Sequence, residues 1–547
     1  NDISGKVQGR TRAFHSQDSL RRAANGVLGD TTETYVLVTG TPRVGRLFGG
    51  GNGNYYDYYG GNFTLNYLNC QPPVQSHTYV DINLDSTRVN SGEGSSTNPY
   101  TKGYIGMAFG GGNQAEVDSA QVMLHGKGLV DTLLAGGNSA TVTRSAVVKS
   151  YASGTIAELD AMGTGCNVKL LFGGNNIAKM TILPTIDLQS GVFDRVFGGG
   201  NAGIMAGQKS GMSDIMGNTI PNPVSTYLVL NSSNVTVRGA LYGGGNQAGV
   251  KGGTYVGVLQ TSAAASPSAA NNTYGINRLF GGNDISDKVD RSRIDIKGGV
   301  VHNIFGGGNG YYLYEPSGVR YNAKEFDGAH NIVARYITGR PNVGQTQVNI
   351  WGGTINANIY GGGYAGDCGK THVVVNDTMG ISNEELGNSN AESGIGHAPQ
   401  QEAEAAEPRA IISGRIYGGG CGILSYTLDP NTATVGNVTD SAITDLYHID
   451  SLGKAYAYGG GYGGDVRDAV ITVHEGWNQE LRELYGGCFG SNVRGTTTVN
   501  MYCTAPEGEG HYNVEYLYGG NDSTGNVHKS VLNVYSGSYG KVFGAGN

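Results

Sequence analysis

The chain has little charge, little proline and almost no tryptophan. Asp, Glu, Lys and Arg make up 15% of its 547 residues, where about a quarter is typical of soluble domains. The net charge is −8 and no cluster of Lys or Arg stands out, which argues against a nucleic-acid surface. No apolar run approaches the roughly 18 residues of a membrane-spanning helix, so we expect no membrane span. With 14 prolines and no Gly-X-Y period, the chain is not collagen-like either.

Cysteine is also sparse, and its spacing fits no metal site. None of the six cysteines forms a CxxC pair, so zinc is not expected. A disulfide framework stays open, but its connectivity among six cysteines cannot be read from sequence. We favour the reading in which most of them are buried, unpaired small residues. They are Cys70, Cys166, Cys368, Cys421, Cys488 and Cys503.

Glycine, by contrast, is abundant and is arranged in a recurring cassette. The chain has 94 glycines, and the cassette reads aliphatic residue, aromatic residue, glycine run and usually Asn. Such long-period self-similarity indicates a repeat architecture. The aliphatic–aromatic pairs are Leu47–Phe48, Ala108–Phe109, Val196–Phe197, Leu241–Tyr242, Leu279–Phe280, Ile304–Phe305, Ile359–Tyr360, Ile416–Tyr417, Leu484–Tyr485, Leu517–Tyr518 and Val542–Phe543.

The cassettes predict a coil of about 25 residues. Phe172 and Phe197 are 25 residues apart, as are Phe280 and Phe305, and longer intervals fit the same unit with insertions. Within a unit, short alternating strands such as Ile294–Ile296 are separated by glycine turns. We therefore predict an all-β fold, a right-handed and three-sided parallel β-helix, or β-solenoid, in which each strand pairs with its equivalent in the next coil.

The cassette residues have predicted structural roles in such a solenoid. Glycine at the corners is expected to supply positive φ, and corner Asn side chains to form a hydrogen-bonded ladder along the axis. The aromatic rings should stack on their equivalents in adjacent coils. The predicted ladder residues are Asn52, Asn113, Asn201, Asn246 and Asn309, and the predicted aromatic column includes Phe48, Phe109, Phe197, Tyr242 and Phe305.

The predicted organisation is one solenoid with loop insertions. Residues 1–40 read as an N-terminal arm or the end of a preceding unit, with a first strand near Tyr35–Val38. Residues 41–547 read as continuous solenoid. Exposed inserts are expected near 71–104, 263–272 and 379–408. Because the chain opens without Met and stops inside a cassette at Asn547, where a natural solenoid would have a capping unit, we expect it to continue beyond 547.

Few residues suggest chemistry. Asp284, Asp287 and Asp290 are the best candidates for an isolated calcium loop, but calcium needs six to eight oxygen ligands, and turn residues are the favoured reading. Asp and Glu are otherwise dispersed, and the eleven His form no motif. We therefore expect no cofactor and no catalytic residues, and predict that the chain is not an enzyme.

Tyrosine gives the best candidates for binding. The chain has 34 Tyr, and two clusters directly follow glycine cassettes. Adjacent strand residues point to opposite faces, so several of these rings should face solvent, where Tyr is a common anchor for proteins or sugars. The alternative is that Tyr merely suits strands. The candidates are Tyr55, Tyr56, Tyr58, Tyr59, Tyr311, Tyr312 and Tyr314.

The in-phase pattern resembles the β-helical repeats of large bacterial surface and secreted adhesins. It is loosely similar to the GGAI and FxxN repeats of chlamydial polymorphic outer-membrane proteins. Gly352-Gly-Thr-Ile355 corresponds to the first motif, and Phe172–Asn175 and Phe280–Asn283 to the second. The extended GGGN departs from that family, and GGAI is not found as written. The resemblance implies an exported adhesin or filament, not a particular ligand.

These observations together predict a non-enzymatic structural or adhesive protein. We expect an extracellular segment on a bacterial surface that displays loops. Its partners would be host-cell or surface glycans and proteins, or other copies of the filament. A phage or viral tail-fibre solenoid is the alternative, and a β-helical polysaccharide lyase or hydrolase is a further one.

Overall fold

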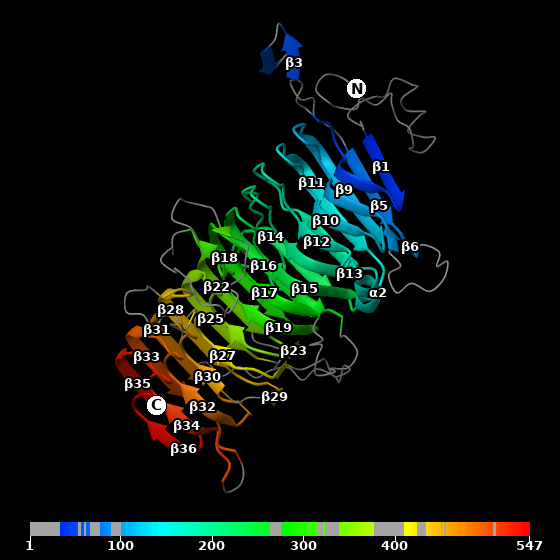
Figure 1. Cartoon of the computed structure of the whole chain (residues 1–547). Helices are drawn as coiled ribbons and strands as arrows, with labels where there is room; N and C mark the ends of the chain where they lie inside the picture. Colours follow the sequence, from blue (N-terminus) through cyan, green and yellow to red (C-terminus); the bar gives the residue numbers. More distant parts are fainter. Residues whose placement is uncertain are drawn as a thin grey trace. The chain divides into compact units, whose positions relative to one another are not determined.

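The structure is a computed structural model that describes most of the chain. The described residues are 33–52, 56–59, 62–65, 77–88, 100–262, 275–314, 321–322, 339–376, 410–423, 434–449, 451–452, 456–477, 479–506 and 510–547. The chain divides into two compact units. The strands of both units are labelled in Figure 1. Unit 1 comprises residues 1–210, 222–256 and 261–291, and unit 2 comprises 211–221, 257–260 and 292–547.

Unit 1 is built from parallel strands that stack coil on coil. Each coil has one longer strand, a turn, and a second strand that ends at the aromatic residue of the cassette. The longer strands are β1 (Glu33–Gly40), β5 (His77–Leu84), β9 (Val117–Gly126), β11 (Val142–Tyr151), the first half of β13 (Thr185–Phe197), β14 (Val224–Asn231) and β16 (Val250–Gln260), whose last four residues belong to unit 2. The second strands are β2 (Arg43–Phe48), β8 (Tyr104–Phe109), β10 (Leu129–Leu134), β12 (Val168–Phe172), the second half of β13, β15 (Val235–Tyr242) and β17 (Ile276–Phe280).

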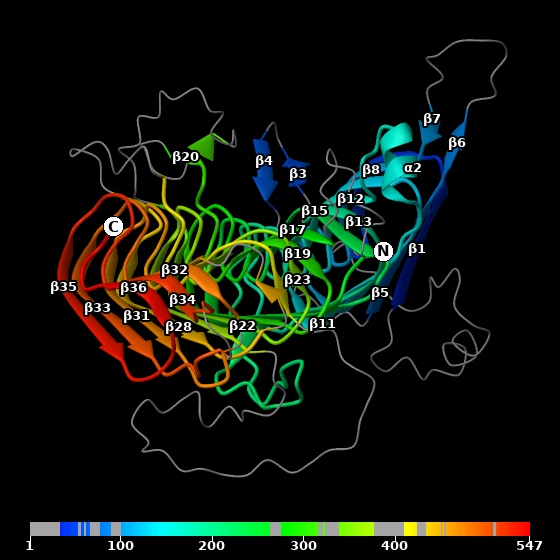
Figure 2. The same cartoon turned by 90° about the horizontal axis from the view of Figure 1, so that it is seen from below.

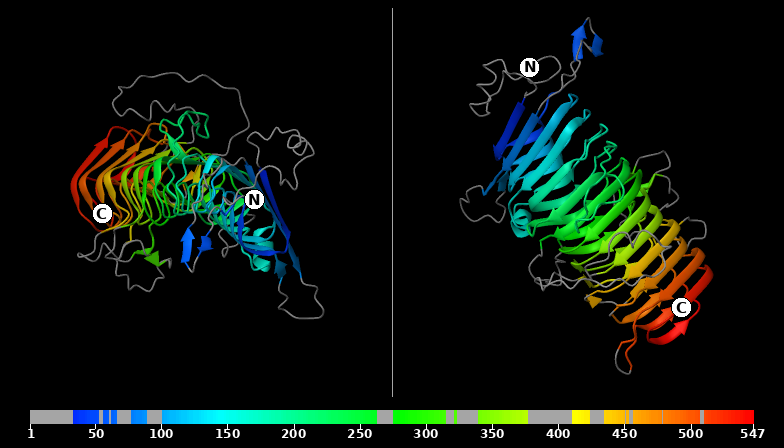
Figure 3. Two further views of the ribbon diagram at one scale, coloured as in Figure 1. Left: turned by 90° about the horizontal axis from the view of Figure 1, so that it is seen from above. Right: turned by 180° about the vertical axis from the view of Figure 1, so that it is seen from behind.

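Unit 2 repeats this plan (Figures 2 and 3). Its longer strands begin with β18 (Lys288–Ile296), which starts in unit 1, and continue with β22 (Asn342–Ile350), β25 (Asp367–Val375), β28 (Val438–Leu446), β31 (Val466–Val473), β33 (Val493–Met501) and β35 (Val527–Val534). Its second strands are β19 (Val300–Phe305), β23 (Thr354–Ile355), β24 (Ile359–Tyr360), β26 (Ile411–Ile412), β27 (Ile416–Tyr417), β29 (Ser451–Leu452), β30 (Tyr456–Tyr458), β32 (Leu481–Tyr485), β34 (Val514–Tyr518) and β36 (Tyr539–Phe543).

Several small elements leave the coils. Antiparallel pairs form between β3 (Tyr56–Tyr59) and β4 (Asn62–Leu65), between β6 (Ser86–Arg88) and β7 (Tyr100–Lys102), and between β20 (Leu313–Tyr314) and β21 (Tyr321–Asn322). A single described helix, α2 (Ile156–Ala161), begins at a capping box in which Thr155 and Glu158 bond each other's backbone N–H. No helix in the described residues has the length and hydropathy needed to cross a membrane.

The predicted fold class is confirmed: the chain is an all-β parallel solenoid, while the three-sided cross-section stays a prediction. In-register pairing joins Phe172 to Phe197 and Tyr518 to Phe543, each at the predicted 25-residue spacing. The sequence reading missed one coil. Leu134 takes the aromatic position and pairs with both Phe109 and Phe172, so the 63 residues between those rings hold two coils. The handedness and the continuity of the solenoid from unit 1 to unit 2 stay predictions.

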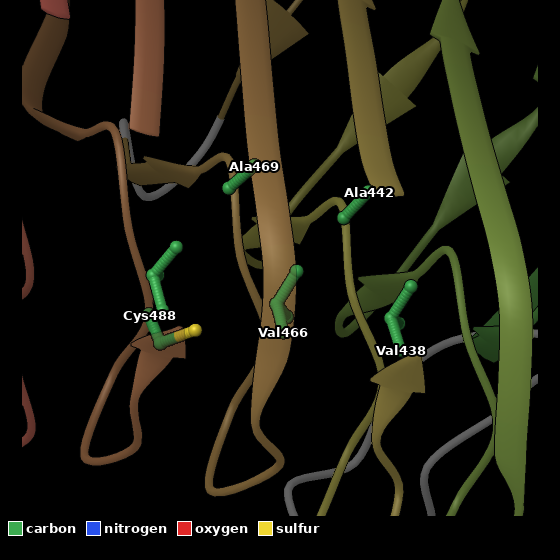
Figure 4. Close-up of a cluster of buried hydrophobic side chains, with 6 residues drawn as sticks. Val438, Ala442, Val466, Ala469 and Cys488 are labelled. Atoms are coloured by element: carbon green, nitrogen blue, oxygen red, sulfur yellow. The ribbon is translucent and has the colours of Figure 1, made fainter. Parts of the chain in front are cut away.

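The core consists of the inward positions of both strand sets. In β31, Ala469, Ile471 and Val473 alternate with more exposed residues, as a strand buried on one face requires. Small residues occupy the tight positions between layers. Figure 4 shows one such cluster, in which Val438, Ala442, Val466, Ala469 and Cys488 from successive coils pack together.

The expected inserts have different outcomes. The ranges 263–272 and 379–408 lie outside the described residues. The range 71–104 is not insert throughout, because β5 pairs in parallel with β1 and β9 and buries Val80, Ile82 and Leu84. Residues 33–40 form β1, so the first strand predicted near Tyr35–Val38 is confirmed.

The cassette glycines correct our expectation about positive φ. Left-handed φ occurs at the turn between the two strands of a coil, for example +77° at Gly299 and +82° at Gly353. The first two glycines of the cassettes adopt no such φ. Their requirement is space, because a Cβ on Gly361 would overlap the carbonyl oxygen of Gly418 and lie 3.0 Å from Val373 Cγ2. Glycine is therefore needed there for close approach of adjacent coils.

Buried Thr and Ser hydroxyls at equivalent positions of successive coils form a column that we did not predict. In many coils a Thr or Ser at the start of the inward face donates to the carbonyl of the first cassette glycine; Thr371 Oγ1 is 2.6 Å from Gly418 O. This contact satisfies a buried carbonyl at the corner. The donors are Thr34, Thr78, Thr226 and Thr254 in unit 1, and Ser292, Thr346, Thr371 and Thr497 in unit 2.

Candidate functional site

The cassette aromatics form a stacked column inside each unit, as predicted. Phe172 and Phe197 stack with ring centroids 4.5 Å apart, and the other pairs range from 4.7 to 5.1 Å. Unit 1 holds the chain Phe172, Phe197, Tyr242 and Phe280 and the pair Phe48–Phe109, and unit 2 holds Phe305, Tyr360, Tyr417, Tyr458, Tyr485, Tyr518 and Phe543. Most of these rings are fully buried, so the column is structural. Phe280 and Phe305 belong to different units, and their stacking stays a prediction.

The predicted asparagine ladder is confirmed in unit 1. The amide Nδ2 of each Asn donates to Oδ1 of the Asn in the preceding coil, at 2.6 or 2.7 Å. The ladder runs through Asn52, Asn113, Asn138, Asn176, Asn201 and Asn246. In unit 2, Asn309 is buried at this position, but the following coils carry Tyr364, Cys421, Tyr462 and Phe489 instead. The amide ladder is therefore a property of unit 1.

We expect Asn176→Ala to destabilise unit 1 by about 1–3 kcal/mol, because it removes one bond to Asn138 and leaves a donor of Asn201 unpaired. Asn176→Asp should cost more at neutral pH, since a carboxylate would face the Oδ1 of Asn138. That variant should regain stability as the pH falls and the carboxyl protonates. Urea unfolding followed by circular dichroism tests both. Equal stability of the Asp variant at pH 7 and pH 4 would contradict the ladder geometry.

Unit 2 has a different ladder, made by Asp and Asn at the start of its longer strands. The side-chain oxygen of each accepts from the backbone N–H of its equivalent in the next coil, at 2.8–3.0 Å. The members are Asp367, Asn437, Asp465, Asn492 and Asn526. A repeated pattern of Gly or Ser, then Asp or Asn, then Val or Cys marks them in the sequence. The two carboxylates of this ladder, Asp367 and Asp465, are thus bonded to backbone N–H groups.

The three candidate calcium ligands have separate partners. Asp284 is buried and lies 3.3 Å from Arg195. Asp287 accepts from Gly249 N–H, and Asp290 from Gly252 N–H. These separate contacts fit the interpretation of the three aspartates as turn residues. In the described part of the chain, no group of three or more His, Cys, Asp or Glu residues is placed to hold a metal ion.

The described cysteines are all unpaired and buried, as we favoured. Burial raises the pKa of Cys421 and of Cys368 to about 12, so these thiols stay protonated and unreactive at neutral pH. Cys70 lies outside the described residues.

The structure separates the seven candidate tyrosines. Tyr56, Tyr58 and Tyr59 lie in β3, which pairs with β4 outside the parallel sheets, and Tyr55 is outside the described residues. Tyr314 lies in β20. Tyr312 is 5% exposed, which corrects the expectation that it could serve as a surface anchor. Tyr311 is half-buried and stacks on Tyr364 with centroids 4.3 Å apart.

One carboxylate on the outer face of unit 2 is held by two histidines. His372 Nε2 is 2.7 Å from one oxygen of Asp445, and His474 Nε2 is 2.9 Å from the other. Burial alone would raise the pKa of Asp445, but the hydrogen bonds from both imidazoles outweigh it and lower that pKa to about 2. The sequence did not indicate this group, because His372, Asp445 and His474 come from three different coils and form no linear motif.

The lowered pKa of Asp445 predicts an acid-dependent contribution to stability. A carboxyl with a depressed native pKa stabilises fully above its unfolded pKa of about 3.9 and loses that contribution as the pH falls through about 2. Asp445→Asn should therefore cost about 2 kcal/mol at pH 5 and progressively less toward pH 2. Asp440→Asn on the same strand is the control, since Asp440 is exposed and pairs only with exposed Arg467. A pH-independent cost at Asp445 would contradict the assignment.

A second aromatic column, on the outer face of unit 2, was missed. It consists of Tyr447, His474, Tyr502 and Tyr535, each directly after a longer strand. The backbone N–H of each donates to the preceding coil, as Tyr502 does to Val473 at 2.8 Å, which keeps the four in register. Tyr447 stacks on His474 at 3.9 Å and Tyr502 on Tyr535 at 4.5 Å. Tyr502 is 42% and Tyr535 61% exposed, so this outer aromatic column reaches solvent.

Comparison with known proteins gives no relative. No protein-family model, no curated protein and no solved structure matches this chain. The site assignments therefore rest on the residues and the geometry alone.

Proposed function

We propose that this chain is a non-enzymatic structural and adhesive segment that acts outside a bacterial cell. The observation that carries the proposal is the use of the cassette side chains for contacts between coils. In both units rings stack on rings and hydroxyls bond to corner carbonyls, and in unit 1 amides also bond to amides. Repeats that bind their neighbours in this way suit a rigid scaffold whose outward side chains and loops are free to engage a partner.

Adherence of the purified chain tests the proposal. Beads coated with the chain should attach to cultured epithelial cells, or to beads carrying the same chain, more than beads coated with an unrelated β-solenoid do. The tyrosine clusters Tyr55, Tyr56, Tyr58, Tyr59 and Tyr311, Tyr314 remain candidate contacts. Replacement of the first cluster by Ser should reduce adherence while the circular dichroism spectrum stays unchanged. Cleavage of a polysaccharide by the purified chain, abolished by a single carboxylate substitution, would overturn the non-enzymatic assignment.

A further inference from the structure

The outer face of β33 and β35 carries a compact group of uncharged side chains. Thr498, Asn500 and Tyr502 alternate along one coil, and Val531, Asn533 and Tyr535 occupy the same positions in the next, since Thr498 pairs with Val531 and Asn500 with Asn533. We call these six residues the neutral strip. A partner that depends on ionic contacts, such as a nucleic acid or an acidic peptide, would find no counter-charge on them.

The amides of the neutral strip retain hydrogen-bonding capacity. Asn533 Nδ2 donates to Asn500 Oδ1 at 2.9 Å, and Asn500 Nδ2 donates to Thr472 Oγ1 in the preceding coil at 3.4 Å, which orients both amides. An amide offers two donors and a carbonyl with two lone pairs, so these contacts leave one donor and one lone pair on Asn500, and one donor and the carbonyl on Asn533, for a ligand. Both residues are only half-buried, so these groups can meet a ligand at the surface.

The tyrosines supply the apolar part of the strip. Tyr502 and Tyr535 stack at an interplanar angle of 6°, are 42% and 61% exposed, and follow Asn500 and Asn533 by two residues on the same face. Partial burial and the neighbouring Tyr535 raise the pKa of Tyr502, so its phenol stays neutral under ordinary conditions. Rigid aromatic surface beside neutral donors and acceptors is the combination that recognises a sugar, whose ring has apolar C–H faces and a rim of hydroxyls.

We propose that the neutral strip binds an uncharged polysaccharide chain. This inference rests on the proposed adhesive function and names its partner class. Because equivalent residues recur at about the 4.8 Å separation of neighbouring strands, an extended polymer can contact several of them at once. Binding therefore strengthens with chain length, and a monosaccharide competes poorly.

Affinity electrophoresis of the full chain in gels containing dextran, mannan, galactan or soluble β-glucan tests the inference, with anionic alginate as the comparison. We expect at least one neutral polymer, and not alginate, to retard the chain. The double variant Tyr502→Ser, Tyr535→Ser should bind about tenfold more weakly or not at all. Tyr151→Ser is the matched control: Tyr151 is the last residue of a longer strand, is 41% exposed and stacks on His125, but it lies in unit 1, two residues after Lys149. Circular dichroism verifies folding of all variants.

Three results would overturn the inference: no retardation by any neutral polymer, equal retardation of the double variant, or retardation by alginate alone. Bead adherence to cells, measured with the same variants, separates this inference from the proposed function. Adherence that survives the double variant and enzymatic removal of surface glycans would leave the adhesive role intact and point to a protein partner. If a neutral polymer retards the chain but the beads adhere neither to cells nor to other copies, polysaccharide binding by the neutral strip is retained and the adhesive function is rejected.

Discussion

Gly361→Val should destabilise unit 2 by about 3–5 kcal/mol. Gly361 follows Tyr360 in the cassette, and a side chain there would overlap the carbonyl of Gly418 in the adjacent coil and press on Val373. The neighbouring backbone cannot move away without breaking the bond from Gly361 N–H to Tyr417 O at 2.9 Å. Overpacking against backbone costs more than overpacking against a flexible side chain. Urea unfolding followed by circular dichroism gives the change.

Gly544→Val is the matched control for that variant. Gly544 has the same cassette position, after Phe543, but a Cβ there meets nothing within 4 Å. Neither glycine has a left-handed φ, so backbone strain is the same for both. If the two variants lose equal stability, the cassette glycines serve chain flexibility and not the approach of coils.

The repeat was predictable because every coil must meet the same physical requirement. Each coil must place one aromatic residue on the next and keep one corner free of side chains, so Phe or Tyr followed by Gly-Gly recurs wherever a second strand ends. The requirement tolerates exceptions when a neighbour compensates. Leu134 replaces the ring and Ala135 the first glycine of their coil, and this one substituted cassette hid a coil from the periodicity.

The reason for the glycines could not be read from the sequence. Positive φ and close approach both select glycine, and only the position of the adjacent coil distinguishes them. Gly299 serves the first requirement and Gly306 the second. The hydroxyl column had a readable signal, a Thr or Ser two places before a buried aliphatic residue of many longer strands, as in Thr371 before Val373, but its purpose depends on a carbonyl 47 residues away.

The candidate sites were harder because they join residues from different coils at insert-dependent spacings. Asp445 reaches His372 and His474 across 73 and 29 residues, so no linear motif describes them. The outer aromatic column has a simpler rule, an aromatic residue or His directly after β28, β31, β33 and β35, but this rule is visible only once strand ends are known. Tyr clustering, which we used instead, selected Tyr312, which is buried.

Tyr458→Ala should strongly destabilise the inner aromatic column of unit 2. The ring is fully buried and stacks on Tyr417 at 4.7 Å and on Tyr485 at 5.1 Å, so its loss leaves a cavity with two unsupported neighbours. Large-to-small replacement of a buried aromatic residue costs about 3–5 kcal/mol. Tyr458→Phe keeps the stack and removes only the 3.0 Å bond from the hydroxyl to Asp522, so it should cost about 1 kcal/mol.

Comparison with Phe543→Ala shows whether stacking on both sides sets the cost. Phe543 stacks on Tyr518 at 4.9 Å and is 41% exposed, so its replacement should cost clearly less than that of Tyr458. Thermal and urea unfolding of the three variants give the order. Because each coil contacts only its neighbours, loss of the Tyr458 ring should also divide the unfolding of unit 2 into two transitions, as a weakened interface between repeats does. A single transition with equal losses for the two alanine variants would show that the column adds little beyond the strand pairing that holds it.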